Sequence, residues 1–461
     1  MKMATPLSGN KPGHAFSSNI VQEKPDLENL PAELRYQVLM WMPDLPTLHS
    51  FVHASPMIYA QYREHRATIL RMCLDHELDG FYLDAYANLM SRVRVIGSPR
   101  TDSKITEFLS SYGAHLSGLI PHPDVNSPDS EGIRWMTAYH NAVARPLAQS
   151  YAKWALANFR DMPASAAAGS ETTDLPRKIN KHDIGLSKSE EIRIYRALYR
   201  YGTYYHLFGR NEGNRHGTFQ RHEINEIFFG LFDPWEAEAV GCIDMFVRQK
   251  YDDIFNEIKR DLAPTNERYK QPNGVFNPSE SFDLDAEHSD YMNGTVSRGL
   301  KMTARLLAIH DHEKLVAKME ECLTHDQCLD APLRLVLGTL AQDDRRQLST
   351  NFPSTRDITE QRRDLVDFAG DGIPPNTPPL AWVLLWNGRY ANIYGDYVPE
   401  LLRRCGYVIW DEQRWVDTQA RDFIFKQWET APELVEEIEM DCNWSPVEDH
   451  KQENDSLGES H

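Results

Sequence analysis

Residues 27–74 read LENLPAELRYQVLMWMPDLPTLHSFVHASPMIYAQYREHRATILRMCL, and prolines divide this stretch into three segments. Pro31 suits the first turn of a helix, because its φ angle is already helical and that position needs no N–H donor. Pro43 stops this helix, since it has no donor and restricts the residue before it. Asp44 can cap a second helix, and Ser55-Pro56 ends that helix and starts the next. The punctuation predicts three short helices.

Each predicted helix carries apolar residues at helical spacing. In the first, Leu34, Val38 and Met42 recur every four residues. The second and third helices repeat the pattern with Leu45, Leu48, Phe51 and Val52, and with Ile58, Tyr62, Ile69 and Cys73. A unit of about fifty residues buries little surface alone. We therefore expect it to pack against a partner, against the rest of the chain, or against both.

The pattern Leu30-Pro31-x-Glu33-Leu34, followed by Val38-Leu39, Leu45-x-x-Leu48 and Val52, resembles the F-box. The resemblance is strongest to F-box proteins of filamentous fungi, in which a DLPTL…ASP stretch is frequent. It implies that the module docks on a Skp-type linker subunit, and through it on the cullin scaffold of a ubiquitin ligase. The residues that the resemblance assigns to this contact are Leu30, Pro31, Leu34, Val38, Leu39, Leu45, Leu48 and Val52.

The third helix departs from the family pattern. Many F-boxes have Cys-x-x-Trp near its start, whereas this chain reads Ser55-Pro56-Met57-Ile58-Tyr59. The resemblance implies a substrate-recognition adaptor that performs no chemistry. The surface that binds its protein substrate, which is unknown, would lie in the residues after about Asp75. Two alternatives stay open: an F-box-like interaction protein that works outside any ligase, and an enzyme with an unrecognised helical active site.

Composition changes suggest the domain organisation. We expect a disordered tail over 1–26, the three-helix module over 27–75, a large irregular helical domain over 76–430, and an acidic tail over 431–461. Internal breaks are expected near 162–174, 263–288 and 371–379. Helical periodicity dominates elsewhere, apart from a short strand expected near Tyr407–Trp410. The predicted fold class is mainly α.

Three helices of the larger domain have distinct sequence signals. A stripe at four-residue spacing runs from Trp135 to Phe159, and Pro146 should kink or split its helix. Ser187-x-x-Glu190 is a capping-box pattern that should open a second helix. Asp233-Pro234 should open a third, with Asp as cap and Pro in the first turn.

The charge and cysteine content narrow the function classes. The formal net charge is −19, from 68 acidic and 49 basic residues, which disfavours nucleic acid and acidic membranes as partners. The six cysteines are scattered and show no zinc or redox spacing, so reduced thiols are expected. No apolar run approaches the ~20 residues of a membrane span. We therefore expect a nuclear or cytoplasmic protein.

The candidate chemical motifs favour structural roles. In His310-Asp311-His312-Glu313 the two histidines would point apart on a helix, and His222-Glu223 lacks the second histidine of a zincin helix. The aromatic stripe Trp382, Trp386, Tyr390 and Tyr394 favours a core, as does the segment from Arg196 to Phe208. The sequence nominates no catalytic residue, no metal ligand and no cofactor.

Overall fold

A computed structural model describes residues 27–167, 185–209, 219–270, 281–325, 332–348, 350, 366–371, 377–386, 398–417 and 424. The described residues are mainly α-helical, as predicted, and they contain no β-strand. The chain divides into two compact units, Met1–Cys73 and Leu74–His461. The predicted tails over 1–26 and 431–461 lie outside the described residues. Within the described residues, no helix is both long and apolar enough to cross a membrane.

The first unit contains the three predicted helices. A 3₁₀ turn at Leu27–Asn29 precedes α1 (Ala32–Met40), α2 (Leu45–Ala54) and α3 (Pro56–Glu77), and the boundary between the units falls inside α3. Asp44 caps α2 as expected, because its Oδ1 accepts the Thr47 N–H at 2.7 Å. The helix α1 ends at Met40, slightly before the predicted stop at Pro43.

Polar contacts hold α1 against α3 within this unit. The Arg35 guanidinium donates to the Leu30 carbonyl at 2.6 Å and to Gln61 Oε1 at 3.1 Å. The Gln61 amide donates in turn to the Ala32 carbonyl at 2.5 Å. Because these bonds end on the backbone at Leu30 and Ala32, they fix the chain around Pro31 relative to α3.

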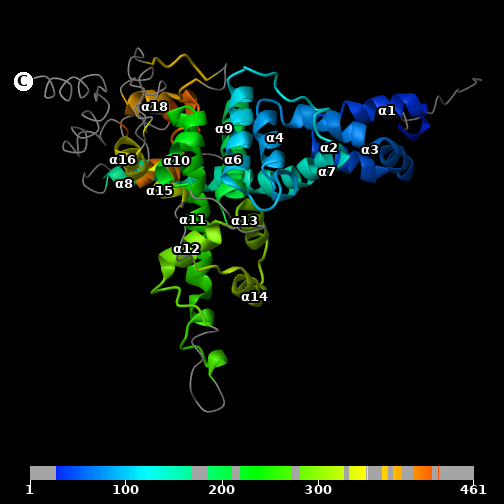
Figure 1. The fold of residues 1–461 in the computed structure, drawn as a ribbon. Helices are drawn as coiled ribbons and strands as arrows, with labels where there is room; N and C mark the ends of the chain where they lie inside the picture. Colours follow the sequence, from blue (N-terminus) through cyan, green and yellow to red (C-terminus); the bar gives the residue numbers. More distant parts are fainter. Residues whose placement is uncertain are drawn as a thin grey trace, which may run out of the picture. The chain divides into compact units, whose positions relative to one another are not determined.

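The second unit is an irregular bundle of helices (Figure 1). Its centre is the pair α9 (Lys188–Phe208) and α11 (Pro234–Leu262), with α4 (Tyr82–Met90) packed on α9. Most side chains of α9 are buried, including Tyr199, Tyr201, Tyr204 and Tyr205. The remaining helices are α5 (Val93–Ile96), α6 (Asp102–Leu116), α7 (Ser130–Tyr139), α8 (Arg145–Ala167), α10 (Arg221–Ile227), α12 (His288–Val296), α13 (Leu300–Leu307), α14 (His312–Cys322), α15 (Leu333–Leu337), α16 (Thr339–Leu348), α18 (Leu380–Leu385), α19 (Glu400–Cys405) and α20 (Glu412–Asp417), with 3₁₀ turns at Phe229–Leu231 and Glu267–Tyr269.

Local sequence signals account for the ends of the central helices. Ser187 Oγ accepts the Glu190 N–H at 3.1 Å, and Glu190 Oε2 accepts the Ser187 N–H at 3.0 Å, so the predicted capping box forms. At the start of α11, Glu236 accepts the Asp233 N–H at 3.3 Å and Pro occupies the first turn. These bonds satisfy backbone donors that a helix leaves open at its start.

The predicted break at Pro146 takes the form of a π-helical turn. His140–Ala144 forms this turn, η2, between α7 and α8. Pro146 has no N–H to donate to the carbonyl four residues earlier, so the regular bonding pattern fails just there. The stripe from Trp135 to Phe159 is therefore split, as expected.

The strand expected near Tyr407–Trp410 is wrong, because these residues form turns after α19. Gly406 adopts a left-handed conformation with φ of 68°, and the Tyr407 N–H bonds back to the Leu402 carbonyl at 3.1 Å. The run from Tyr407 to Trp410 is apolar because every side chain in it is buried, not because it pairs in a sheet.

The expected core positions are confirmed where the structure describes them. Trp382 and Trp386 are buried, and so is most of the segment from Arg196 to Phe208. Tyr390 and Tyr394 lie outside the described residues.

Candidate functional site

The residues predicted to contact a linker separate by exposure into two groups. Leu39, Leu45, Leu48 and Val52 are at most 3% exposed. Leu30 and Val38 are half-buried, whereas Pro31 and Leu34 are exposed. The accessible part of the predicted surface is therefore the N-terminal end and one face of α1.

The exposed face of α1 is a continuous apolar stripe. Pro31, Leu34, Val38 and Trp41 follow one another at steps of three, four and three residues, which places them on one side of the helix. Leu34 is 46% exposed and Trp41 is 74% exposed. A second face of α1 is also apolar, since Leu39 lies on it and is buried. A helix that is apolar on two faces normally has both covered.

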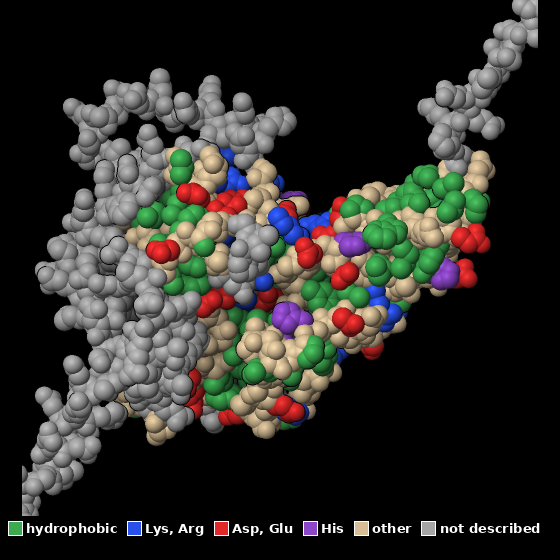
Figure 2. Space-filling view, turned by 90° about the horizontal axis from the view of Figure 1, so that it is seen from above, with side chains coloured by type: hydrophobic (Ala, Val, Ile, Leu, Met, Phe, Trp, Pro, Cys, Tyr) green, Lys and Arg blue, Asp and Glu red, His purple; other side chains and the backbone are tan. Residues whose placement is uncertain are grey.

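Sequence reasoning missed Trp41, the most exposed member of this stripe. Its signal was present, because Trp41 lies seven residues after Leu34 and three after Val38, both of which were nominated. It also missed Met57 and Tyr59, which are 45% and 43% exposed at the start of α3. Figure 2 shows hydrophobic side chains gathered on the surface of the N-terminal helices.

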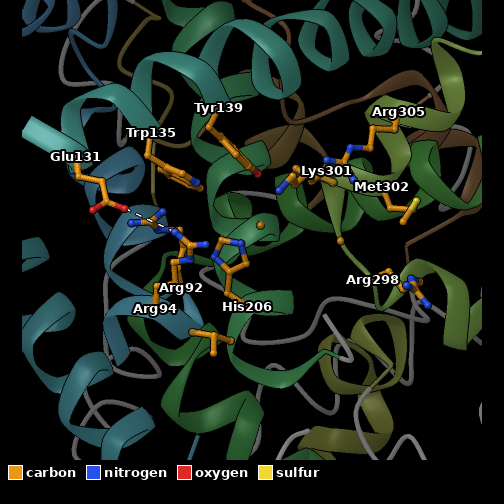
Figure 3. A pocket seen from close by; sticks show the side chains of 14 residues that line it. Arg92, Arg94, Glu131, Trp135, Tyr139, His206, Arg298, Lys301, Met302 and Arg305 are labelled. Carbon is orange, nitrogen blue, oxygen red and sulfur yellow. Dashed lines mark ion pairs between the residues drawn. The ribbon is translucent and has the colours of Figure 1, made fainter. Parts of the chain in front are cut away.

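The second unit contains a cavity of about 560 Å³ with a strongly basic lining. It lies between α5, α7, α9 and the first half of α13 (Figure 3). Its charged lining residues are five cations and one carboxylate: Arg92, Arg94, Arg298, Lys301, Arg305 and Glu131. This concentration of positive charge contrasts with the net charge of −19 of the whole chain.

Two of the five cations are engaged at the edge of the cavity. Arg94 pairs with Glu131 at 3.7 Å, and both side chains are largely exposed. Arg298 donates to Thr324 Oγ1 at 3.0 Å, and its head points away from the other cations (Figure 3). The other three cations of the lining are Arg92, Lys301 and Arg305.

Arg92 is held rigidly by its surroundings. Its guanidinium lies 4.3 Å from the centroid of the Trp135 ring, and its Nε donates to the Leu89 carbonyl at 3.0 Å. Trp135 in turn stacks on Tyr139 with ring centroids 4.8 Å apart. An arginine stacked on an aromatic face loses little freedom when it forms further bonds.

His206 lines the same cavity in its neutral form. Burial, together with the nearby charges of Arg100, Arg92 and Lys301, lowers the pKa of His206 to about 4. Its Nδ1 forms a hydrogen bond with Ser91 Oγ at 2.9 Å. His206 therefore adds no charge to the cavity near neutral pH.

His312 belongs to one of the motifs considered for metal binding. His312 pairs with Glu257 at 3.0 Å and with Asp261 at 3.3 Å on an exposed surface. No group of three or more metal-ligating side chains occurs among the described residues.

No family model, no curated protein and no solved structure matches the chain.

Proposed function

We propose that the chain is a protein-binding adaptor whose N-terminal unit docks a Skp-type linker subunit through the exposed face of α1. The observation that supports this is the stripe of Pro31, Leu34, Val38 and Trp41, with Trp41 74% exposed. Large apolar side chains aligned on one helix face are typical anchors for a partner protein. Three of the four residues, Pro31, Leu34 and Val38, belong to the F-box-like pattern.

The proposed division of labour assigns recognition of the target to the second unit. The linker would connect the N-terminal unit to a cullin scaffold, and the second unit would hold a protein substrate. An adaptor of this kind accelerates ubiquitin transfer by raising the local concentration of the substrate near the loaded partner. It needs no catalytic residue of its own, and it would work in the nucleus or the cytoplasm.

The test is capture of a Skp-type linker by the full chain in a low-salt pull-down. We expect the wild-type chain to retain the linker and the double variant Leu30→Ala/Pro31→Ala to lose it, because both changes remove apolar surface at the start of the stripe. The matched control is Leu119→Ala, which truncates a leucine that is 81% exposed in the second unit.

The outcomes separate the proposal from its alternatives. Failure of the wild-type chain to capture the linker would exclude assembly into a ligase. Capture of other proteins that depends on Trp41 would then support an interaction protein that works outside a ligase. Equal loss of linker with Leu119→Ala would show that the contact is not specific to α1.

A further inference from the structure

We propose that the basic cavity of the second unit binds a small organic molecule that carries two or more phosphoryl groups. This site is distinct from the α1 face and does not depend on linker binding. It is formed by side chains from four separate segments, so no basic run in the sequence marks it.

The unbalanced charge of the cavity is the first argument. Lys301 and Arg305 lie one turn apart on α13, and neither forms an ion pair with any described residue. Like charges at this spacing repel each other and destabilise a helix. Arg92 adds a third cation on the facing wall (Figure 3). An anion in the cavity would offset this repulsion and would form charge-assisted hydrogen bonds.

The start of α13 adds a second source of positive potential. Gly299, Leu300, Lys301 and Met302 line the cavity, so the first turn of this eight-residue helix faces it. Gly299 caps the helix with φ of 79° and offers no side chain to bond the first amides. The open N–H groups and the helix dipole favour an anion at this end.

Tyr139 places a hydrogen-bond donor at the wall of the cavity. The residue is 6% exposed, and its hydroxyl points into the cavity, where it bonds to no described residue (Figure 3). Burial raises the pKa of Tyr139, so the hydroxyl keeps its proton and can only gain by donating it to an acceptor.

The size and chemistry of the cavity select the ligand class. Arginine and lysine side chains beside helix amides are the usual partners of phosphoryl oxygens. A volume of about 560 Å³ lies in the range of sites for whole small molecules, roughly 300–1,000 Å³. It exceeds what a single inorganic phosphate fills. Cations on two facing walls suit a molecule with phosphoryl groups at two ends.

The test uses fructose 1,6-bisphosphate as probe on the full chain, with fructose and inorganic phosphate for comparison. Calorimetry at matched ionic strength should show saturable binding of the bisphosphate, at least tenfold tighter than that of inorganic phosphate, and none of fructose. Lys301→Met and Arg305→Met should each weaken binding about tenfold. The control Lys314→Met changes an exposed lysine on the next helix by the same charge and should leave the affinity unchanged.

Tyr139→Phe distinguishes binding in a specific site from non-specific attraction of an anion to the basic surface. This variant keeps the ring and the net charge, so it should fold normally and lose several-fold in affinity. The proposal is overturned if the wild-type chain shows no saturable binding, or if Lys314→Met weakens binding as much as Lys301→Met. Much tighter binding of a doubly phosphorylated serine peptide would overturn the assignment to a small molecule. None of these results depends on capture of a linker.

Discussion

At the scale of single residues, buried ion pairs stabilise the second unit. Arg200 of α9 is 3% exposed, and it pairs with Asp84 of α4 at 2.7 Å and with Glu236 of α11 at 3.0 Å. Tyr112 of α6 donates its hydroxyl to Asp84 at 2.5 Å. One guanidinium therefore links three helices through largely buried charged groups.

Arg200→Met should destabilise the second unit strongly. The change leaves the buried Asp84 without its nearest counter-charge, and loss of one partner from a buried pair destabilises by about 3–5 kcal/mol. Urea unfolding followed by circular dichroism measures this. Lys318→Met breaks an exposed pair with Glu321 and should leave the unfolding midpoint unchanged. A midpoint for Arg200→Met close to that of the wild type would contradict this role.

His206 should make stability depend on pH in a defined window. Its pKa of about 4 in the folded chain lies below the ordinary value of 6.5, so the unfolded chain takes up this proton first as the pH falls. The free energy of unfolding is then largest above pH 6.5 and decreases toward pH 4. Between pH 7 and pH 4.5, protonation of His206 should lower the free energy of unfolding by roughly 1–3 kcal/mol.

The matching measurement is urea unfolding of His206→Gln and wild type at several pH values. The variant cannot be protonated, so its free energy of unfolding should fall less steeply than that of the wild type below pH 6.5. His140, whose pKa burial also lowers, keeps part of the dependence in both proteins. Parallel curves for the two proteins would show that His206 does not contribute.

At the scale of elements, the end of α19 shows how one glycine terminates a helix. Gly406 has φ of 68°, its N–H bonds to the Arg403 carbonyl at 3.0 Å, and the next N–H bonds to the Leu402 carbonyl at 3.1 Å. This is the hydrogen-bond pattern of a Schellman motif. A side chain at this position would also lie 2.5 Å from the Tyr151 hydroxyl of α8.

Gly406→Ala should therefore destabilise more than the same change at Gly118. Gly118 also has a positive φ, 72°, but a Cβ there meets nothing within 4 Å. Gly118→Ala should lower the free energy of unfolding by roughly 1–2 kcal/mol, because alanine is strained in this left-handed backbone conformation. At Gly406 the clash of the new Cβ with buried Tyr151 should lower the free energy of unfolding further, by about 1–3 kcal/mol. Thermal unfolding of the two variants gives the comparison, and equal shifts would argue against close packing of α19 on α8.

At the scale of the whole molecule, the sequence predicted the features that neighbouring residues determine. It missed the features that depend on packing between residues far apart in the sequence. The capping box at Ser187, the helix start at Asp233-Pro234 and the break at Pro146 depend on neighbouring residues, and all three appear in the structure. The strand expected at Tyr407–Trp410 failed because burial by the rest of the unit, not sheet pairing, explains its apolar run.

The two candidate sites also differ in how far the sequence could predict them. Three of the four residues of the α1 face, Pro31, Leu34 and Val38, were nominated from the resemblance to the F-box, and Trp41 fits their helical spacing once the helix is known. The basic cavity could not be predicted, because Arg92, Tyr139 and Lys301 come together only when α5, α7 and α13 pack in one unit.

Direct titration of the full chain with a purified Skp-type linker tests the central claim, that α1 is a docking face. Calorimetry should give a dissociation constant in the micromolar range or tighter for wild type, and Trp41→Ala should weaken it at least tenfold, or about 1.4 kcal/mol. Leu119→Ala should bind like the wild type, and circular dichroism should show that all three proteins are equally helical. An absence of binding by the wild-type chain, or equal binding by Trp41→Ala, would contradict the claim.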